Sequence, residues 1–226
     1  MSISCCFIVM ACAGRKHNAG RLALRRQFVH FVAHPETYID FHDGVFAAPD
    51  DTAEDGQSWR EKLAAYNQTP QDNLLGFLPA GELYRPPVYG ELAAHVGADK
   101  LYILSAGWGL VRSDFLLPDY NITFSDHADR GVRRFKTDEQ WCDFMQLPTD
   151  IIEPVVCFGS RAYIRFFTRL TAGIAAPRHA FRRVAVGEEG EAKMNGGVRR
   201  HDYGTDRRTN WHHACARDFM NGKIGI

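Results

Sequence analysis

Short apolar runs recur along the chain, separated by stretches in which apolar residues have helical spacing. Ser4–Ala11, Leu101–Leu104 and Ile151–Phe158 are nearly continuous runs of strand-forming residues, a pattern typical of strands covered on both faces. Arg178–Val186 and Tyr120–Phe124 are two further strand candidates. The pattern therefore predicts a sheet whose main strands are distributed over most of the chain.

Helices are expected between these strands, where apolar residues recur every three or four positions. The predicted helices are Arg21–Val32, Ser58–Tyr66 with Ser58 as its cap, Pro86–Gly97, Thr137–Met145, Ala162–Leu170 and Thr209–Met220. Strands that alternate with helices indicate an α/β fold, here a three-layer domain with a largely parallel central sheet and helices on both faces. We expect residues 1–226 to form this single α/β domain.

Residues 34–78 fit this alternation least, and we interpret them as an acidic insertion or lid. Residues 1–35 carry five basic and no acidic side chains, whereas residues 36–99 carry three basic and twelve acidic ones. Residues 126–226 carry seventeen basic and thirteen acidic side chains, so the formal net charge of the whole chain is +0. The basic ends could hold a polyanion, although charges of this kind commonly only solvate helix faces.

Composition limits the class of protein. The chain has 226 residues, of which 45% are hydrophobic and 24% charged, as in ordinary globular proteins. Its apolar start has no basic leading region and no run is long enough to span a bilayer, so we expect a cytoplasmic protein without a membrane partner. The six cysteines lie mostly in apolar runs, which favours reduced thiols.

Known cofactor motifs are absent from the sequence. The small polar loop after the first strand lacks the GxxxxGK[ST] and GxGxxG spacings, so no nucleotide cofactor is expected. His212, His213 and Cys215 could supply half of a zinc site, but no matching pair lies elsewhere at a suitable spacing. We therefore predict that the protein uses neither a metal nor another cofactor.

Leu101–Ser125 is the stretch around which the other motifs are organised. The apolar run at its start ends in Ser105-Ala106-Gly107-Trp108-Gly109, where the glycines permit positive φ or close approach of a ligand. Pro118 and Asp119 then mark a turn. A buried strand that ends in a small-residue loop is how open α/β sheets form sites at the carboxyl ends of their strands, although a strand, turn and hairpin without a site would show the same pattern.

Several of these segments resemble the YaaA-like family. The resemblance is carried by Cys12-Ala13-Gly14-Arg15-Lys16, Pro79-Ala80-Gly81-Glu82-Leu83-Tyr84, Leu104-Ser105-Ala106, Gly109-Leu110 and Pro118-Asp119-Tyr120. It covers roughly Ser4–His17 and Pro79–Ser125, with a long segment between the two parts and Trp108 in place of a smaller or more polar residue. The resemblance implies a nucleic-acid-associated protein of this fold and says little about the reaction.

Three loops that each follow a predicted strand should share one edge of the sheet: Cys12–Asn18, Ser105–Tyr120 and Phe158–Arg161. Together they offer cations, aromatic rings, amides and carboxylates, the groups needed to extract a base from DNA and hold it. A carboxylate can also stabilise the oxocarbenium-like state through which a glycosidic bond breaks. We assign four candidate catalytic residues, in this order: Asp119, Asp114, Asn121 and Asn18.

Each carboxylate also has a purely structural interpretation, Asp119 as a turn residue after Pro118 and Asp114 as a cap after Ser113. The candidate nucleic-acid-binding residues are Arg15, Lys16, Trp108, Tyr120, Ser160, Arg161, Arg207 and Arg208. Trp108 could instead belong to the core. Lys16 could contact a phosphate or act as an amine nucleophile on a deoxyribose.

Two classes of function follow, with DNA as the partner in both. The first is a DNA glycosylase-like hydrolase that flips out and excises a modified base, as a phage defence that acts on foreign DNA. The second is a non-catalytic protein that recognises modified, damaged or distorted DNA through its basic ends. A nucleoside-processing glycosyl transferase that uses the same carboxylate on a free nucleoside is a third alternative.

Overall fold

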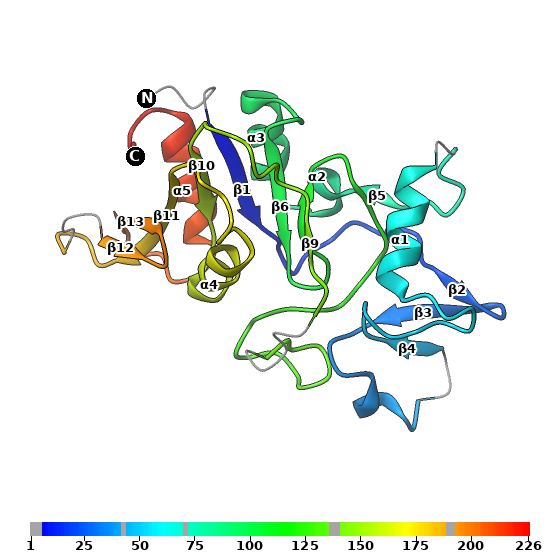
Figure 1. Ribbon diagram of the computed structural model, residues 1–226. Coiled ribbons are helices and arrows are strands. Elements are labelled where there is room, and N and C mark those ends of the chain that lie inside the picture. The colour runs from blue at the N-terminus through cyan, green and yellow to red at the C-terminus, as the bar shows by residue number, and fades with distance from the viewer. Residues whose placement is uncertain (1–5, 42–43, 70–71, 136–140, 189–192) are drawn as a thin grey trace.

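The computed structural model describes residues 6–41, 44–69, 72–135, 141–188 and 193–226, and its centre is an eight-stranded mixed sheet (Figure 1). The strand order across this sheet is β12-β13-β11-β10-β1-β6-β7-β9. In chain order its strands are β1 (Phe7–Ala11), β6 (Leu101–Ser105), β7 (Gly109–Arg112), β9 (Phe144–Met145), β10 (Val155–Phe158), β11 (Arg178–Val184), β12 (Lys193–Asn195) and β13 (Val198–Gly204). The expected strands Ser4–Ala11, Leu101–Leu104, Ile151–Phe158 and Arg178–Val186 overlap β1, β6, β10 and β11.

Five neighbouring strands, β13, β11, β10, β1 and β6, run parallel to one another. β7 is antiparallel to β6, and β12 is antiparallel to β13. The predicted α/β class with a largely parallel sheet is therefore confirmed. In the register of β1, Ala11 pairs with Leu104 of β6 and Met10 with Phe158 of β10, so the loops after these three strands leave the same edge of the sheet.

Helices cover both faces of the sheet, as expected. α3 (Val88–Val96) and α5 (Trp211–Met220) cover one face, where Ile8 and Met10 of β1 are buried. α4 (Arg161–Leu170) covers the other face, where Val9 is buried. The alternation of Ile8, Val9 and Met10 between two apolar layers explains why β1 is a continuous apolar run.

Segment 34–78 contributes to a smaller unit beside the main sheet (Figure 1). This unit contains a three-stranded sheet of β2 (Ala23–Leu24), β3 (Gln27–Phe31) and β4 (Val45–Ala47), together with the 3₁₀ helix η2 (Pro35–Tyr38) and helix α1 (Trp59–Gln68). Ser58 caps α1 as predicted, in a reciprocal capping box with Glu61. The remaining elements are α2 (Ala80–Leu83) and the antiparallel pair β5 (Leu78–Pro79) and β8 (Leu116–Leu117).

The predicted helix Arg21–Val32 is wrong, because this segment forms the antiparallel pair β2–β3. Arg25 and Arg26 take positive φ values of 47° and 78° in the turn between the strands, which a helix does not allow. In β3, Val29 and Phe31 are buried while Phe28 is 59% exposed, so burial alternates with a period of two. The two buried side chains pack into the same core as Trp59 and Leu63 of α1, and this packing stabilises the extended conformation.

Two other predicted elements differ from the structure. The helix expected at Thr137–Met145 lies partly outside the described residues, and its last two residues form strand β9, parallel to β7. Tyr120–Phe124 does not form a regular strand; it makes single bridges, from Tyr120 to Phe31 and from Thr123 to Arg133. The first bridge attaches the segment after β8 to β3 of the smaller sheet. It brings Tyr120 next to the loop that follows β1.

Candidate functional site

The loop after β1 is held in place by the residues at the C-terminal end of α2. The His17 amide donates a hydrogen bond to the Leu83 carbonyl (2.8 Å), and the Arg85 amide donates to the Arg15 carbonyl (3.1 Å). The Arg85 side chain also donates to the Lys16 carbonyl over 2.7 Å. These bonds fix the backbone of Lys16 on each side, so its side chain has a defined starting point at the edge of the sheet.

The Lys16 side chain extends from this loop over the face of Tyr120. Its Nζ lies 4.2 Å from the centroid of the Tyr120 ring, a cation–π distance. Burial lowers the pKa of the Lys16 ammonium, while the nearby Cys12 and Asp119 act in the opposite direction. Burial thus favours release of the proton from this amine, and the neighbouring carboxylate opposes that release.

A network of buried hydroxyl groups lies beneath Lys16. The Tyr84 and Tyr120 hydroxyl oxygens are 2.6 Å apart, and Ser105 Oγ donates to the Tyr120 hydroxyl over 2.9 Å. Burial raises the pKa of both phenols, so they remain protonated hydrogen-bond donors. Tyr120 is thereby immobilised at its hydroxyl end and covered by Lys16 on its ring face, and it supports Lys16 rather than offering a surface for stacking.

Lys16 and Asp119 line the same cavity, which has a volume of about 410 Å³ and is named here the Asp119 cavity. Its lining residues are Gly14, Lys16, Arg21, His30, Phe31, Val32, Tyr38, Phe46, Asp119, Tyr120 and Asn121. Asp119 accepts hydrogen bonds from Arg21 Nη2 (2.8 Å) and Arg21 Nε (3.2 Å), both at Oδ2. The other carboxylate oxygen has no hydrogen bond among the described residues. Of the four candidate catalytic residues, Asp119 and Asn121 thus share one cavity.

One wall of the Asp119 cavity is a stack of three rings from the smaller sheet and η2. Tyr38 and Phe46 are parallel within 2° with centroids 4.4 Å apart, and Phe46 and His30 are 5.1 Å apart at 23°. Burial and then the Arg21 charge lower the pKa of His30, whereas Asp119 acts to raise it. His30 is therefore the ring of the stack that interacts with the Asp119–Arg21 pair. Sequence reasoning missed this wall, because its three rings come from separate short elements.

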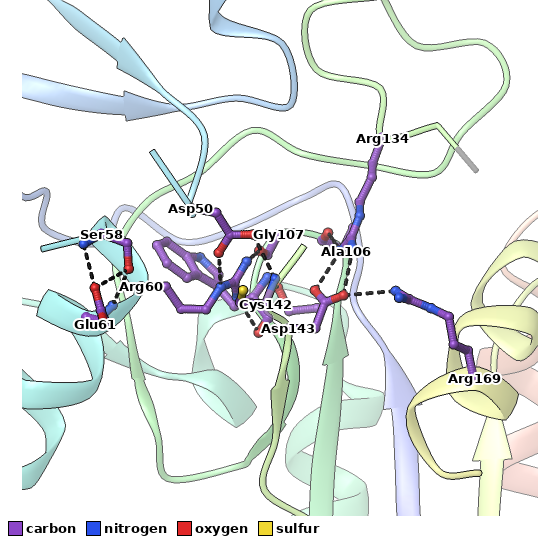
Figure 2. A network of polar contacts seen from close by, with 12 residues as sticks. Asp50, Ser58, Arg60, Glu61, Ala106, Gly107, Arg134, Cys142, Asp143 and Arg169 are labelled. Carbon is purple, nitrogen blue, oxygen red and sulfur yellow. Dashed lines mark hydrogen bonds and ion pairs between the residues drawn. The ribbon is translucent and has the colours of Figure 1, made fainter. Parts of the chain in front are cut away.

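Two buried arginines clamp the Ser105–Trp108 loop through its backbone carbonyls (Figure 2). Arg60 of α1 donates to the Trp108 carbonyl (2.9 Å) and to the Gly107 carbonyl (3.1 Å), and pairs with Asp50. Arg134 donates to the Ala106 carbonyl (2.9 Å) and forms two hydrogen bonds with Asp143. The two guanidinium groups donate to three consecutive carbonyls, and the Trp108 carbonyl also accepts from the Phe144 amide of β9 (2.9 Å).

The clamp explains why the predicted role of Trp108 is wrong. Its side chain has no exposed surface and packs edge-on against Phe31, with ring centroids 5.0 Å apart. The flanking glycines had suggested exposure, but Gly109 instead brings β7 against β9: a Cβ there would lie 2.4 Å from the Phe144 carbonyl oxygen. Trp108 is a core residue with no surface on which a ligand could stack.

Asp114 and Asn18 do not join Asp119. β7 runs back along β6, and the amide of Ser113 donates to the carbonyl of Leu101, so Asp114 lies at the opposite edge of the sheet. There it forms a surface ion pair with Arg112, and it does not contribute to the Asp119 cavity. Asn18 lines a different depression, beside Arg85.

The candidate phosphate contacts are spread along the carboxyl edge of the sheet. Arg15 is exposed beside Lys16, and Ser160 and Arg161 begin α4 after β10. Arg207 and Arg208 are exposed and follow β13, which is separated from β1 by β11 and β10. At about 4.8 Å per strand, this places them roughly 14 Å from the first loop, a distance that suits contacts to several phosphates rather than one.

Among the residues that the structure describes, no three His, Cys, Asp or Glu side chains gather as a metal site, and no helix has the length and apolar character needed to cross a membrane. Comparison of the chain with protein-family models and with curated proteins gives no match. The site is therefore interpreted from its geometry.

Proposed function

We propose that this chain cleaves the N-glycosidic bond of a modified base in DNA, and that the Asp119 cavity is its active site. One observation carries the proposal: a carboxylate, a half-buried lysine amine and a stacked aromatic wall line the same cavity. A flipped base needs a flat surface to stack on and polar groups to read its edge. A ring at the end of the His30–Phe46–Tyr38 stack supplies the first, and Asn121 the second.

Asp119 provides negative charge where the sugar becomes positive. As the bond between C1′ and the base nitrogen breaks, the sugar develops oxocarbenium character that a nearby carboxylate stabilises. Arg21 holds Asp119 through Oδ2 alone, which leaves Oδ1 for this contact or for the attacking water. The water adds its oxygen to C1′ and transfers a proton to Asp119.

Lys16 stabilises the leaving base. The electron pair of the broken bond stays on the base nitrogen, which takes a proton from Lys16 Nζ, and solvent later restores the protonation of both side chains. A general acid works best when its pKa lies near the working pH, and burial moves the pKa of Lys16 in that direction. The Tyr120–Tyr84–Ser105 network keeps the amine over the Tyr120 ring.

The resemblance to the YaaA-like family agrees with this proposal, since Cys12–Lys16 and Pro118–Tyr120, the segments that carry it, contribute Lys16 and Asp119 to one cavity. The acidic charge of segment 34–78 also fits. Part of that segment forms the wall that meets a base, not the edge that meets phosphates.

The test is to incubate the purified protein with unmodified DNA and with DNA containing a panel of modified bases, followed by alkaline cleavage of abasic sites and mass spectrometry of released bases. We expect abasic sites in at least one modified DNA, lost at least 100-fold in D119N and K16M. D114N is the matched control and should retain full activity, since Asp114 lies at the opposite edge of the sheet.

Three results would contradict the proposal. Bound but intact DNA in every sample would favour the non-catalytic DNA-binding protein. Cleavage of free nucleosides alone would favour the nucleoside-processing enzyme. Equal loss of activity in D114N and D119N would mean that neither carboxylate acts in the cavity.

A further inference from the structure

A second concentration of charge lies on the α4 side of the sheet, where β11 and β13 extend beyond the helix. Ala180 of β11 pairs with Arg200 of β13, and Arg182 pairs with Asp202. Ala180 and Val198 belong to the apolar layer beneath α4. Because side chains alternate along a strand, Arg182 and Arg200 project from this same face.

α4 adds two more arginines to this face. Arg161, Arg165 and Thr168 are spaced four and three residues apart and therefore share one side of the helix. Thr168 marks where that side points: a Cβ added at Gly196, in the turn between β12 and β13, would lie 2.6 Å from its Cγ2. Arg161 and Arg165 thus face the β12–β13 hairpin, next to Arg200.

The electrostatics of Arg200 agree with this placement. Its pKa is lowered by burial first and then by the charges of Arg165, Arg161 and Arg182. Its Nε atom is buried without a hydrogen-bond partner. In the part of the chain that the structure describes, Arg161, Arg165 and Arg200 have no ion pair, and Asp202 is engaged by Arg182 through two hydrogen bonds. Among the described residues, these are four guanidinium groups beside one carboxylate.

We propose that Arg161, Arg165, Arg182 and Arg200, named here the arginine cluster, bind the phosphate backbone of a nucleic acid. The planar guanidinium group matches the oxygens of a phosphate with two parallel hydrogen bonds. The cluster spans one helical turn between Arg161 and Arg165, about 6 Å, and crosses two strands about 4.8 Å apart, so it can meet more than one phosphate. This inference rests on the proposed function only because it takes the polyanion to be a nucleic acid.

The cluster does not belong to the Asp119 cavity. Arg161 follows β10 at the carboxyl edge of the sheet, whereas Arg182 and Arg200 lie on strands further from β1. A strand held at the cavity by Arg15 and Lys16 could therefore continue along the edge of the sheet to the cluster. The cluster would supply affinity without sequence information, as phosphate contacts do.

The test is fluorescence anisotropy with labelled single-stranded and double-stranded 20-mers of unmodified DNA at a series of salt concentrations. For R161Q/R165Q, both changes lying on an exposed helix side, we expect at least a tenfold loss of affinity. The slope of log K against log salt should become shallower by about one unit per phosphate contact removed. R200Q should show the same effect, with its fold checked by circular dichroism.

The matched control is R217Q, because Arg217 lies on α5 at the opposite face and pairs with Glu91. R217Q removes one positive charge, as R200Q does, and should bind like the wild type. Equal binding by R161Q/R165Q and the wild type would overturn the inference, as would an equal loss in R217Q. Binding to anionic phospholipid vesicles but not to DNA would also overturn it.

The base-release assay separates this inference from the proposed function. If wild-type protein releases no base but its DNA binding depends on the cluster, the proposed function fails and the inference stands. If base release proceeds and the cluster variants bind DNA normally, the inference alone fails.

Discussion

Replacing Arg134 by methionine should destabilise the protein strongly, because this guanidinium sits at the centre of a buried network (Figure 2). The side chains of Arg134 and Asp143 are each only 1% exposed, and their two hydrogen bonds measure 2.8 and 2.7 Å. The guanidinium also stacks on Trp141 at 4.1 Å. Methionine keeps much of this apolar contact but none of the charge.

The loss in free energy of unfolding is estimated from the buried groups that lose their partner. Removing one partner of a buried ion pair costs about 3–5 kcal/mol, since it leaves an uncompensated charge. Asp143 keeps the hydrogen bond from Arg169 (2.9 Å), which places the cost near the lower end of that range. The Ala106 carbonyl loses a donor as well, worth about 1 kcal/mol. We expect R134M to lower the free energy of unfolding by about 4 kcal/mol.

Urea denaturation followed by circular dichroism measures this change, and a double-mutant cycle with D143L tests its cause. When both charges are removed, no unpaired charge stays buried, so R134M/D143L should cost much less than the sum of the single variants. R133Q is the matched control: its partner Asp126 is exposed, and it should cost less than about 1 kcal/mol. A loss below 1 kcal/mol for R134M, or additive single variants, would refute the reasoning.

The His212 and Gly109 sites give two further predictions. Burial lowers the pKa of His212 to about 3 from an ordinary 6.5, so the unfolded chain binds the proton more tightly and stability falls as pH drops below 6.5. Urea denaturation should show that H212Q removes roughly 2 kcal/mol of the stability difference between pH 7.5 and pH 5.0, and an unchanged pH dependence would contradict this. Gly109→Ala should cost at least about 2 kcal/mol, because its φ is +98° and the added Cβ would collide with Phe144. Gly90→Ala, in an open helical position, should be neutral or slightly stabilising in the same measurement.

The parts of the fold that were predicted correctly are those in which local pattern and tertiary environment agree. β1, β6 and β10 are buried on both faces, and a continuous apolar run is the direct consequence of that burial. Ser58 is followed three residues later by Glu61, and the capping box forms as the pattern indicates. In Arg21–Val32, by contrast, apolar residues fit both periods, and contacts with distant α1 select the strand.

The sequence predicted the position of those site residues that depend only on which loop carries them. Lys16 and Asp119 meet because the loop after β1 and the segment after β8 both reach the carboxyl edge of the sheet. Asp114 was misplaced because β7 reverses at Gly109 and carries it to the other edge, and the local pattern fits such a hairpin as well as it fits a site. The environment of Trp108 depends on Arg60 and on Arg134, which lie 48 and 26 positions away in the sequence.

The distribution of charge could also be predicted only in part, because ion pairs depend on contacts that the sequence does not show. Counting charges by segment indicates an acidic middle and basic ends, but several of the acids are neutralised nearby: Asp50 by Arg60, Asp55 by Lys62 and Glu54 by Arg25. Pairing therefore decides which cations are available to a partner, and position in the chain does not. Arg60 and Arg134 are engaged with backbone carbonyls and carboxylates inside the fold, so their positive charge stabilises a loop.

The arginine cluster differs from Arg60 and Arg134 because its charges are not balanced inside the fold. Its members repel one another and Arg200 is partly desolvated, so the cluster raises the free energy of the folded state when nothing is bound. A phosphate backbone would remove that repulsion on binding. Variants that abolish DNA binding here should consequently leave the folded protein as stable as the wild type or more so, whereas R134M loses stability outright. Thermal unfolding of R161Q/R165Q beside R134M distinguishes the two kinds of arginine, and a loss of several degrees in R161Q/R165Q would mean that this cluster, too, is structural.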